Sequence, residues 1–433
     1  MNPPRLRSGR FFCTCYTGTM KLKKLWKSLG PGLITGAADD DPSAIATYSI
    51  AGAVAGTGQL WILLYILPFM IAVQSMCARI GALTGCGLAA NIKQHYPKWL
   101  LLIAAISLVA ANVFNIGADV YGMAGALNLF VPIKIGLLAV IMAAFILWLV
   151  ITLKYRQIER IFKWFALSLY VYGIALLIVK PDWPMMLLHT LVPSLQFSKG
   201  ALIALFAVLG TTISPYIFFW QASEEAEVSD EGHRVRTCKY HQIRPGVLKG
   251  VDRDTNIGMI SSNVISFFIM ALTASTIFRA GGGSIVTLRD AAQALVPLAG
   301  PFASILFAIG LVGSGLLAIP VLAGSAAYVV AELMGWPASL DRPFNRARQF
   351  YIVIVFSVVL GMLMPLFGIT PIQALFWTAI INGLIAPILI MLIIDMARNP
   401  KIVGPHTSNV PTYMLGLGTL LFMLTGTIFL IFS

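Results

Sequence analysis

Charged residues are scarce in this sequence. Asp, Glu, Lys and Arg make up 11% of its 433 residues, against about 25% in soluble globular domains. Hydrophobic residues account for 58%, and the mean hydropathy is +0.85. This composition excludes an ordinary soluble protein and indicates an integral membrane protein.

Cysteine and histidine are also few, and neither is arranged as in a familiar site. The five cysteines show no regular pairing pattern, and Cys13 and Cys15 are too close for an ordinary disulfide or half a zinc site. The five histidines lack metal-ligand spacing. We assign the cysteines no role. With no catalytic constellation in the sequence, we expect neither an enzyme nor a resident cofactor.

Long apolar runs alternate with short polar segments, as in helices that cross a bilayer. Charged residues collect between the runs because burying an unpaired charge in hydrocarbon is costly. Windows of about 20 residues predict about eleven membrane-spanning helices in an all-α protein embedded in the lipid bilayer. They lie near residues 28–54, 59–78, 99–128, 132–152, 160–179, 199–223, 256–279, 302–334, 349–367, 371–396 and 412–432.

Lys and Arg are distributed unequally between the two sides that these spans define. Of the 30 Lys and Arg residues, 25 fall on the side of the N-terminal tail and 5 on the other. This bias predicts a multi-pass membrane protein with its N-terminus inside and its C-terminus outside. It also accounts for the net charge of +13, so we expect no nucleic-acid partner.

The first span contains three adjacent carboxylates and a proline. Asp39, Asp40 and Asp41 precede Pro42 in an otherwise apolar segment. Pro42 lacks an N–H and its ring clashes with the preceding turn, so nearby backbone carbonyls lose their helical partners. Irregular backbone at this depth is tolerated only where it is buried in protein or lines a cavity. A bound cation would satisfy the carbonyls and the carboxylates together, while a simple proline kink is the alternative.

The sixth span is interrupted in the same way. Ser214 and Pro215 break its apolar stretch, and the charge count gives it the opposite direction to the first span. Two broken antiparallel helices are typical of transporters built from inverted repeats, with the site near the midplane. We predict a basic cytoplasmic tail (1–27), two five-helix repeats (28–180 and 181–397) and an additional helix 11 (398–433).

These segments resemble the NRAMP family of divalent-metal transporters. The first span of that family reads roughly Gly-Pro-Gly, Asp-Pro-Gly-Asn and Ala-Gly-Ala, and this sequence has Gly30-Pro31-Gly32, Asp41-Pro42 and Ala51-Gly52-Ala53 at matching spacing. In the sixth span, Ser214-Pro215-Tyr216 stands where the family has Met-Pro-His. Further agreement occurs at Asp119, Leu127-Asn128, Tyr155-Arg156-Gln157-Ile158-Glu159 and Ala323-Gly324-Ser325. The resemblance covers nearly the whole chain and implies a LeuT-type 5+5 inverted repeat with broken helices 1 and 6.

The resemblance also implies a metal site between the two breaks. Carried over by position, its members are Asp41, Ala44, Ser214 and the backbone carbonyl of Thr211, with Tyr216 beside them. The family has asparagine at position 44 and a methionine at position 214. Only Asp41 and Thr211 therefore keep the family's ligand chemistry.

These departures change the expected ion. A thioether favours softer transition metals, and Ser214 removes it. Mg²⁺ prefers oxygen ligands and keeps several of its waters, and the small side chains of Ala44 and Ser214 leave a wider, oxygen-only site. The pattern resembles the NRAMP-related magnesium transporters, a bacterial branch, so we expect Mg²⁺ as the transported ion, with Mn²⁺ also accepted. The resemblance implies a place in the bacterial cytoplasmic (inner) membrane.

Further acids lie along the expected ion path. Asp39 and Asp40 attract cations on the inner path, or alternatively are neutralised by protonation beside Asp41. Three helical turns place Glu225 almost under Ser214 and about 16 Å inward, so Glu224 and Glu225 are expected near the cytoplasmic exit. A solvated acidic helix end is the alternative. Other polar residues within spans are interpreted as bridges between helices: Asn112, Asn115, Tyr121, Asn263 and Asn382.

Proton coupling is expected to be absent or weak. Typical family members use acids in span three and histidines in span six, and the resemblance places Asp119 at the second acid of the Asp-x-x-Glu pattern. The first acid is replaced by Ile116, and the histidine positions hold Tyr216 and Gln221. Neither of these two side chains titrates near neutral pH. We place Asp119 and Gln221 on the expected ion path.

The sequence thus predicts a secondary transporter for divalent cations that works by alternating access and is expected to be a monomer. Two alternatives stay open. One is a proton-coupled Mn²⁺ or Fe²⁺ importer of the usual family type. The other is a LeuT-fold carrier for amino acids or organic cations, in which the acids of the first span would meet an ammonium group.

Overall fold

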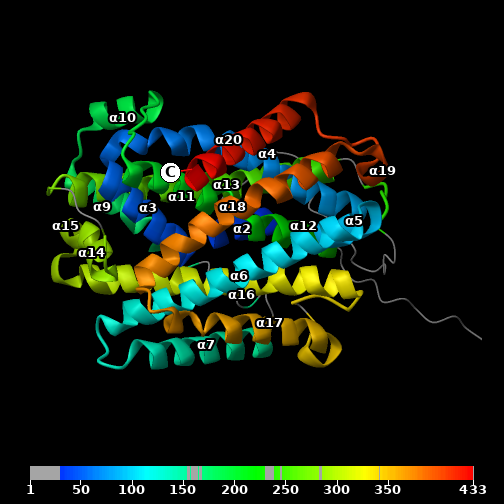
Figure 1. The fold of residues 1–433 in the computed structure, drawn as a ribbon, viewed down its shortest axis with the longest axis horizontal. Helices are drawn as coiled ribbons and strands as arrows, with labels where there is room; N and C mark the ends of the chain where they lie inside the picture. Colours follow the sequence, from blue (N-terminus) through cyan, green and yellow to red (C-terminus); the bar gives the residue numbers. More distant parts are fainter. Residues whose placement is uncertain are drawn as a thin grey trace, which may run out of the picture.

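The computed structural model describes residues 30–432 except for 154–156, 158–163, 165–167, 230–237, 244–245, 282–284 and 341. The predicted basic tail (1–27) and much of the first half of the predicted fifth span lie outside the described residues. Within the described part, long helices run side by side in one bundle (Figure 1). In this bundle α2 (Pro31–Asp39) packs against both α12 (Pro215–Ser229) and α13 (Val247–Thr273).

Nine helical segments of the described residues are long and apolar enough to cross a membrane. They are Trp61–Thr84 (α4), Lys98–Asn128 (α6), Ile135–Thr152 (α7), Lys199–Val228 (α11 with α12), Val247–Phe278 (which contains α13), Leu288–Met334 (which contains α14, Leu288–Ala292, α15, Val296–Ala299, and α16, Ala303–Met334), Arg348–Phe367 (which contains α17, Arg348–Gly361), Pro371–Arg398 (α18) and Val410–Ile431 (within α20). The predicted first span is present as two shorter helices, and the fifth ends in α9 (Val171–Val179). The predicted set of about eleven spans is therefore confirmed.

Both predicted interruptions are present. The first span is divided into α2 (Pro31–Asp39) and α3 (Pro42–Ala55), and the sixth into α11 (Lys199–Thr212) and α12 (Pro215–Ser229). In each case the second helix begins at a proline. Proline is well suited to a first helical turn, where its missing N–H has no partner to lose. The sequence Asp-Pro or Ser-Pro thus ends one helix and starts the next.

Close helix contacts fix the two halves of the first span. α2 packs along α13 (Val247–Thr273), where a Cβ added to Gly32 would lie 2.6 Å from the backbone nitrogen of Thr255. A Cβ on Gly36 would collide with the carbonyl of Gly258. α3 packs against α6, α11, α13 and α18, so the break between α2 and α3 lies inside the bundle.

The outer helices are much less enclosed. In the apolar stretch of α20 only 17% of the residues are buried, against 83% in the apolar stretch of α11 and α12. α7 and α17 lie at one edge of the bundle (Figure 1). These exposed apolar faces are the surfaces that lipid covers, and the peripheral place of α20 (Val410–Phe432) suits an appended eleventh helix.

The seventh span begins earlier than predicted. The predicted start was residue 256, whereas α13 begins at Val247. Its charged first turns are satisfied by neighbours: Asp252 pairs with Arg79 of α4 at 2.5 and 2.7 Å. Asp254 accepts from the backbone N–H groups of Gly30 (3.1 Å) and Gly32 (2.7 Å) at the start of α2. The sequence prediction left residues 247–255 out of the span because they carry charges, and it could not show that Asp252 and Asp254 have partners in the fold.

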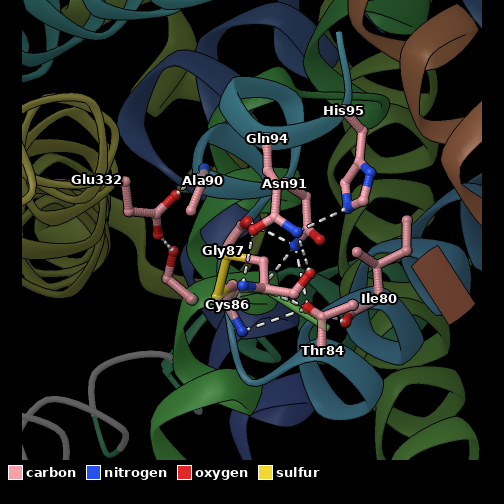
Figure 2. The surroundings of a disulfide bond; sticks show 11 residues. Ile80, Thr84, Cys86, Gly87, Ala90, Asn91, Gln94, His95 and Glu332 are labelled. Carbon is pink, nitrogen blue, oxygen red and sulfur yellow. Dashed lines mark hydrogen bonds between the residues drawn. A yellow bond between two sulfur atoms is a disulfide. The ribbon is translucent and has the colours of Figure 1, made fainter. Parts of the chain in front are cut away.

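Cys86 and Cys238 form a disulfide, with Cα atoms 5.6 Å apart and a sequence separation of 152. Figure 2 shows its surroundings, which include Gln94 of α5 (Leu88–His95). The side-chain oxygen Oε1 of Gln94 accepts from the backbone N–H of Cys238, and its side-chain amide donates to the backbone carbonyl of Cys238, both at 2.9 Å. Assigning no role to the cysteines was wrong for this pair, because only the folded chain brings them together.

Reduction of this disulfide is expected to lower the thermal unfolding temperature of the purified protein. A cross-link over so long a loop restricts the unfolded chain and typically contributes about 2–4 kcal/mol. Cys238→Ser should lower the midpoint and abolish its response to reductant. Cys77→Ser is the control, since Cys77 is buried and not disulfide-bonded, and it should keep the response. An unchanged midpoint after full reduction of the wild type would contradict a stabilising role.

Candidate metal site between the broken helices

Asp41 lies at the break in the first span and caps α3. Its Oδ1 accepts from the backbone N–H of Ala44 and from the hydroxyl of Ser43, both at 2.7 Å. Its Oδ2 accepts from the amide of Asn115 on α6 at 3.1 Å. One carboxylate oxygen is thus used to start the helix, while the other faces α6 and α12.

The break in the sixth span faces Asp41 through Tyr216. The Tyr216 hydroxyl donates to the carbonyl of Ala38 at 2.8 Å and lies 3.5 Å from Asp41 Oδ2. The Ser214 hydroxyl donates to the carbonyl of Thr211 at 2.6 Å. The sequence predicted carbonyls left free for a cation. Instead, hydroxyl groups from the sixth span hold two of them, because serine and tyrosine supply donors where the helices are interrupted.

The residues around the two breaks are closed to solvent. Asp41, Thr211 and Ser214 are each 2% exposed, Tyr216 is 1% exposed and Ala44 is fully buried. The methyl group of Ala44 offers no ligand, and its contribution is the backbone N–H that Asp41 accepts. The oxygens gathered here come from carboxylate, hydroxyl, amide and backbone groups, which are the ligand types of hard cations.

Asp39 and Asp40 face α13 rather than α12. The hydroxyl of Ser262 lies 3.1 Å from Asp39 Oδ2 and 3.1 Å from Asp40 Oδ1. One hydroxyl carries a single proton, so it can donate fully to only one of them at a time. The other oxygens, Asp39 Oδ1 and Asp40 Oδ2, have no partner within the described part of the chain. Both of these oxygens are buried acceptors beside the break at Asp41.

No group of three or more His, Cys, Asp or Glu side chains in the described ranges has a geometry that could hold a metal ion. The site is therefore unlike a structural metal centre, in which several charged ligands enclose the ion. Asp41 is the carboxylate at the two breaks, and the groups that donate to it there are neutral. So few charged groups are suited to an ion that binds and leaves.

Comparison with known proteins agrees with this geometry. The sequence profile described as "Natural resistance-associated macrophage protein-like", named Nramp, matches residues 32–433. This chain belongs to the Nramp family. The match extends over the broken first span, the sixth span and the eleventh helix.

Relatives of this Nramp chain are similar over most of its length. A "Divalent metal cation transporter MntH" from Caldanaerobacter subterraneus subsp. tengcongensis is 25% identical over 386 residues, which is 88% of this chain and 87% of the relative. A "Metal transporter Nramp6" from Oryza sativa subsp. japonica is 27% identical over 305 residues, 68% of this chain and 54% of the relative.

Solved structures show the same fold. A manganese transporter from Eremococcus coleocola superposes with a TM-score of 0.74 at 19% identity, covering 96% of this chain and 88% of the other. Mhp1 in an inward-facing conformation gives a TM-score of 0.51 at 14% identity, covering 93% and 91%. The LeuT-type inverted repeat with broken helices 1 and 6 is thereby confirmed for this Nramp chain.

Gln221, at the second position where the resemblance implied a histidine, is held in a polar network between three helices. Its Oε1 accepts from Gln74 of α4 at 2.5 Å and its amide donates to Thr255 of α13 at 2.7 Å. Both ends of the side chain are therefore occupied. Its predicted place on an ion path stays a prediction, and the structure shows it as a bridge in α12.

The acidic end of α12 is not the solvated helix end that was the alternative interpretation. Glu225 is 4% exposed, and Glu224 lies 3.2 Å from the hydroxyl of Tyr328 on α16 (Ala303–Met334). The same hydroxyl donates to Glu227 at 2.7 Å. These hydrogen bonds join α12 to α16 near the end of α12 that lies away from the break. The assignment of Glu224 and Glu225 to an ion path remains a prediction.

Two residues of α6 complete the surroundings of Asp41. The sequence placed Asp119 on an ion path and interpreted Asn115 as a bridge between helices. The structure brings both toward Asp41: Asn115 donates to it, and Asp119 is close enough for the two carboxylates to interact electrostatically. Their spacing of one helical turn was the available signal, because residues i and i+4 share a helix face.

Proposed function

We propose that this Nramp chain is a secondary transporter for divalent cations, with Mg²⁺ as its main substrate and Mn²⁺ also accepted. The observation that carries the proposal is the position of Asp41, a buried carboxylate at the junction of two broken helices. Transporters of this architecture bind their substrate at such breaks near the midplane.

The ligand chemistry supports Mg²⁺. Position 214, where the resemblance implied a methionine thioether, holds a serine. Its hydroxyl donates to the carbonyl of Thr211. Mg²⁺ is usually held by one or two carboxylates while it keeps several waters. Asp41, with the Thr211 carbonyl, Ser214 and Tyr216 opposite, can hold such an ion when the hydroxyls turn from the carbonyls toward its waters.

Transport is proposed to be uncoupled from protons, or only weakly coupled. Tyr216 and Gln221 both serve as hydrogen-bonding groups, to Ala38, Gln74 and Thr255. The driving force is then the ion gradient together with the membrane potential. Moving two charges through 100 mV corresponds to about 4.6 kcal/mol, which is sufficient for accumulation without a proton.

The proposed setting is the bacterial cytoplasmic membrane, with the N-terminus inside and the C-terminus outside, as the distribution of Lys and Arg favours. Residues 28–180 and 181–397 act as the two repeats, and rocking of one bundle against the other exposes the site to either side. We propose that the protein works as a monomer, because one chain contributes both broken helices.

Uptake into proteoliposomes tests this function. Purified wild-type protein is expected to carry Mg²⁺ and Mn²⁺ down an inwardly negative potential, with no change in internal pH beyond that of protein-free vesicles. Cd²⁺ should compete poorly because the site lacks sulfur. The other candidate is a proton-coupled Mn²⁺ or Fe²⁺ importer, and one of the similar solved structures is of a manganese transporter. Tight competition by Cd²⁺ and internal acidification that disappears in Asp119→Asn would support that candidate and contradict ours.

A further inference from the structure

The face of α6 that meets Asp41 carries three buried oxygen atoms. Asn115 Oδ1 and both carboxylate oxygens of Asp119 are buried, and within the part of the chain that is described none of them makes a hydrogen bond of ordinary length and angle. The backbone of Ser43 still interacts with Asp119. Asn115 is 1% exposed and Asp119 is fully buried. Buried polar atoms are nearly always paired, so three such atoms on one helix face need an explanation.

The orientation of Asn115 is set by its neighbour. Asp41 Oδ2 can only accept when ionised, so the amide group of Asn115 must be the one that faces it, at 3.1 Å. The amide oxygen of Asn115 is then fixed beside the carboxylate with no donor to satisfy it. An oxygen in that position next to Asp41 is suited to bind a cation or one of its waters.

Asp119 lies one turn further along α6. Its carboxylate is close to Ser43, in the first turn of α3, and near enough to Asp41 to interact with its charge. α3, α6 and α16 are tightly packed there: a Cβ on Gly315 of α16 would lie 3.1 Å from Pro42 and would collide with Met123. Asp119 is therefore held against the break in the first span.

We propose that Asn115 and Asp119 supply, directly or through bound water, the oxygen ligands that the site lacks at Ala44 and Ser214. The ion would then lie between α3 and α6. Asp41 would bind it together with the groups of the sixth span on one side and with those of α6 on the other. This inference rests on the proposed function. It adds α6 to the metal site, although the family resemblance implied no metal ligand from that helix. Two carboxylates and an amide oxygen around one ion favour a hard divalent cation.

Asn112 provides a matched control on the same helix. It is equally buried, at 1% exposed, but its amide donates to the carbonyl of Leu322 on α16 at 3.1 Å. Asn112 is thus a bridge between helices, the role that the sequence suggested for both asparagines. Asn112→Ala and Asn115→Ala remove the same group from two positions three residues apart, only one of which reaches Asp41.

Isothermal titration of purified protein with Mg²⁺ and with Mn²⁺ tests the assignment. Asn115→Ala is expected to weaken Mg²⁺ binding about 10- to 100-fold, the range found when groups that orient or complete a metal site are removed. Asn115→Asp, which keeps an oxygen at this position, should retain binding, and Asn112→Ala should bind like the wild type. Asp119→Asn is expected to weaken the binding of both ions, because it replaces a charged oxygen ligand by a neutral one.

The outcomes separate this inference from the proposed function. Equal Mg²⁺ affinity in Asn115→Ala, Asn112→Ala and wild type, in proteins with native elution profiles, would overturn the role of Asn115. Equal loss in both alanine variants would overturn it as well, since a bridging asparagine would then have the same effect. A wild-type protein that neither binds nor transports Mg²⁺ or Mn²⁺ would instead contradict the function itself.

Discussion

Replacing Asp41 with alanine is expected to abolish divalent-cation binding and transport. Asp41 is the carboxylate at the junction of the two breaks, and its Oδ2 is the oxygen that faces both Asn115 and Tyr216. Without it, Asp119 would be the one carboxylate of the proposed ligand set, in a place closed to solvent. Burial of an uncompensated charge costs far more than such contacts return.

The same substitution also removes a helix cap, so its effects must be separated. Loss of an N-cap costs about 0.5–2 kcal/mol of stability. Asp182 is the matched control, because its side chain caps α10 (Trp183–Leu191) by accepting from the N–H of Met185 at 3.1 Å. Asp182→Ala should lower thermal stability slightly and leave Mg²⁺ uptake intact. Measurable Mg²⁺ uptake by folded Asp41→Ala protein would show that Asp41 is not the essential ligand.

Restoring the family's ligands should convert the ion preference. The double variant Ala44→Asn with Ser214→Met returns an amide oxygen and a thioether to the site. A thioether discriminates in favour of soft ions, so Cd²⁺ affinity is expected to rise by at least about tenfold, or about 1.4 kcal/mol. Mg²⁺ transport should fall strongly, because the larger side chains displace water that Mg²⁺ retains.

The single variants divide this effect into its parts. Ala44→Asn adds only a hard ligand and should leave Cd²⁺ binding weak, whereas Ser214→Met should account for most of the gain. Binding of Cd²⁺ and Mg²⁺ is measured by titration and uptake in parallel. A well-folded double variant that transports Mg²⁺ as before and gains no affinity for Cd²⁺ would show that position 214 does not set the preference.

The spans and their interruptions could be predicted from the sequence because both depend on local chemistry. Apolar length defines a membrane helix, and proline ends one helix and begins another. Asp41-Pro42 and Ser214-Pro215 therefore located the breaks, and α3 and α12 begin at those prolines. The antiparallel relation of the two breaks followed from the distribution of Lys and Arg.

The rest depended on contacts between distant segments. Nothing in the local sequence shows that Tyr216 reaches the carbonyl of Ala38 or that Cys86 meets Cys238. Asn112 and Asn115 are alike in the sequence, and only the packing of α6 separates a helix bridge from a neighbour of Asp41. The breaks were predictable, while the partners of each polar group were decided by the fold.

Hydroxyl groups of the sixth span hydrogen-bond to the carbonyls at both breaks. Ser214 and Tyr216 hold the carbonyls of Thr211 and Ala38, and buried carbonyls without partners would be costly. Entry of an ion would exchange these hydrogen bonds for contacts with the ion or its waters. Tyr216→Phe should then leave the Ala38 carbonyl unsatisfied and lower the thermal unfolding temperature of the ion-free protein, and added Mg²⁺ should recover part of that loss.

The position of the ion tests the account most directly. Mn²⁺ bound in crystals of this protein can be located by its anomalous scattering. We expect a single strong peak within direct or water-bridged distance of Asp41, beside Asn115 and facing the interruption between α11 and α12. A peak elsewhere in the bundle, with Asp41 still bonded only to protein groups, would contradict the central claim.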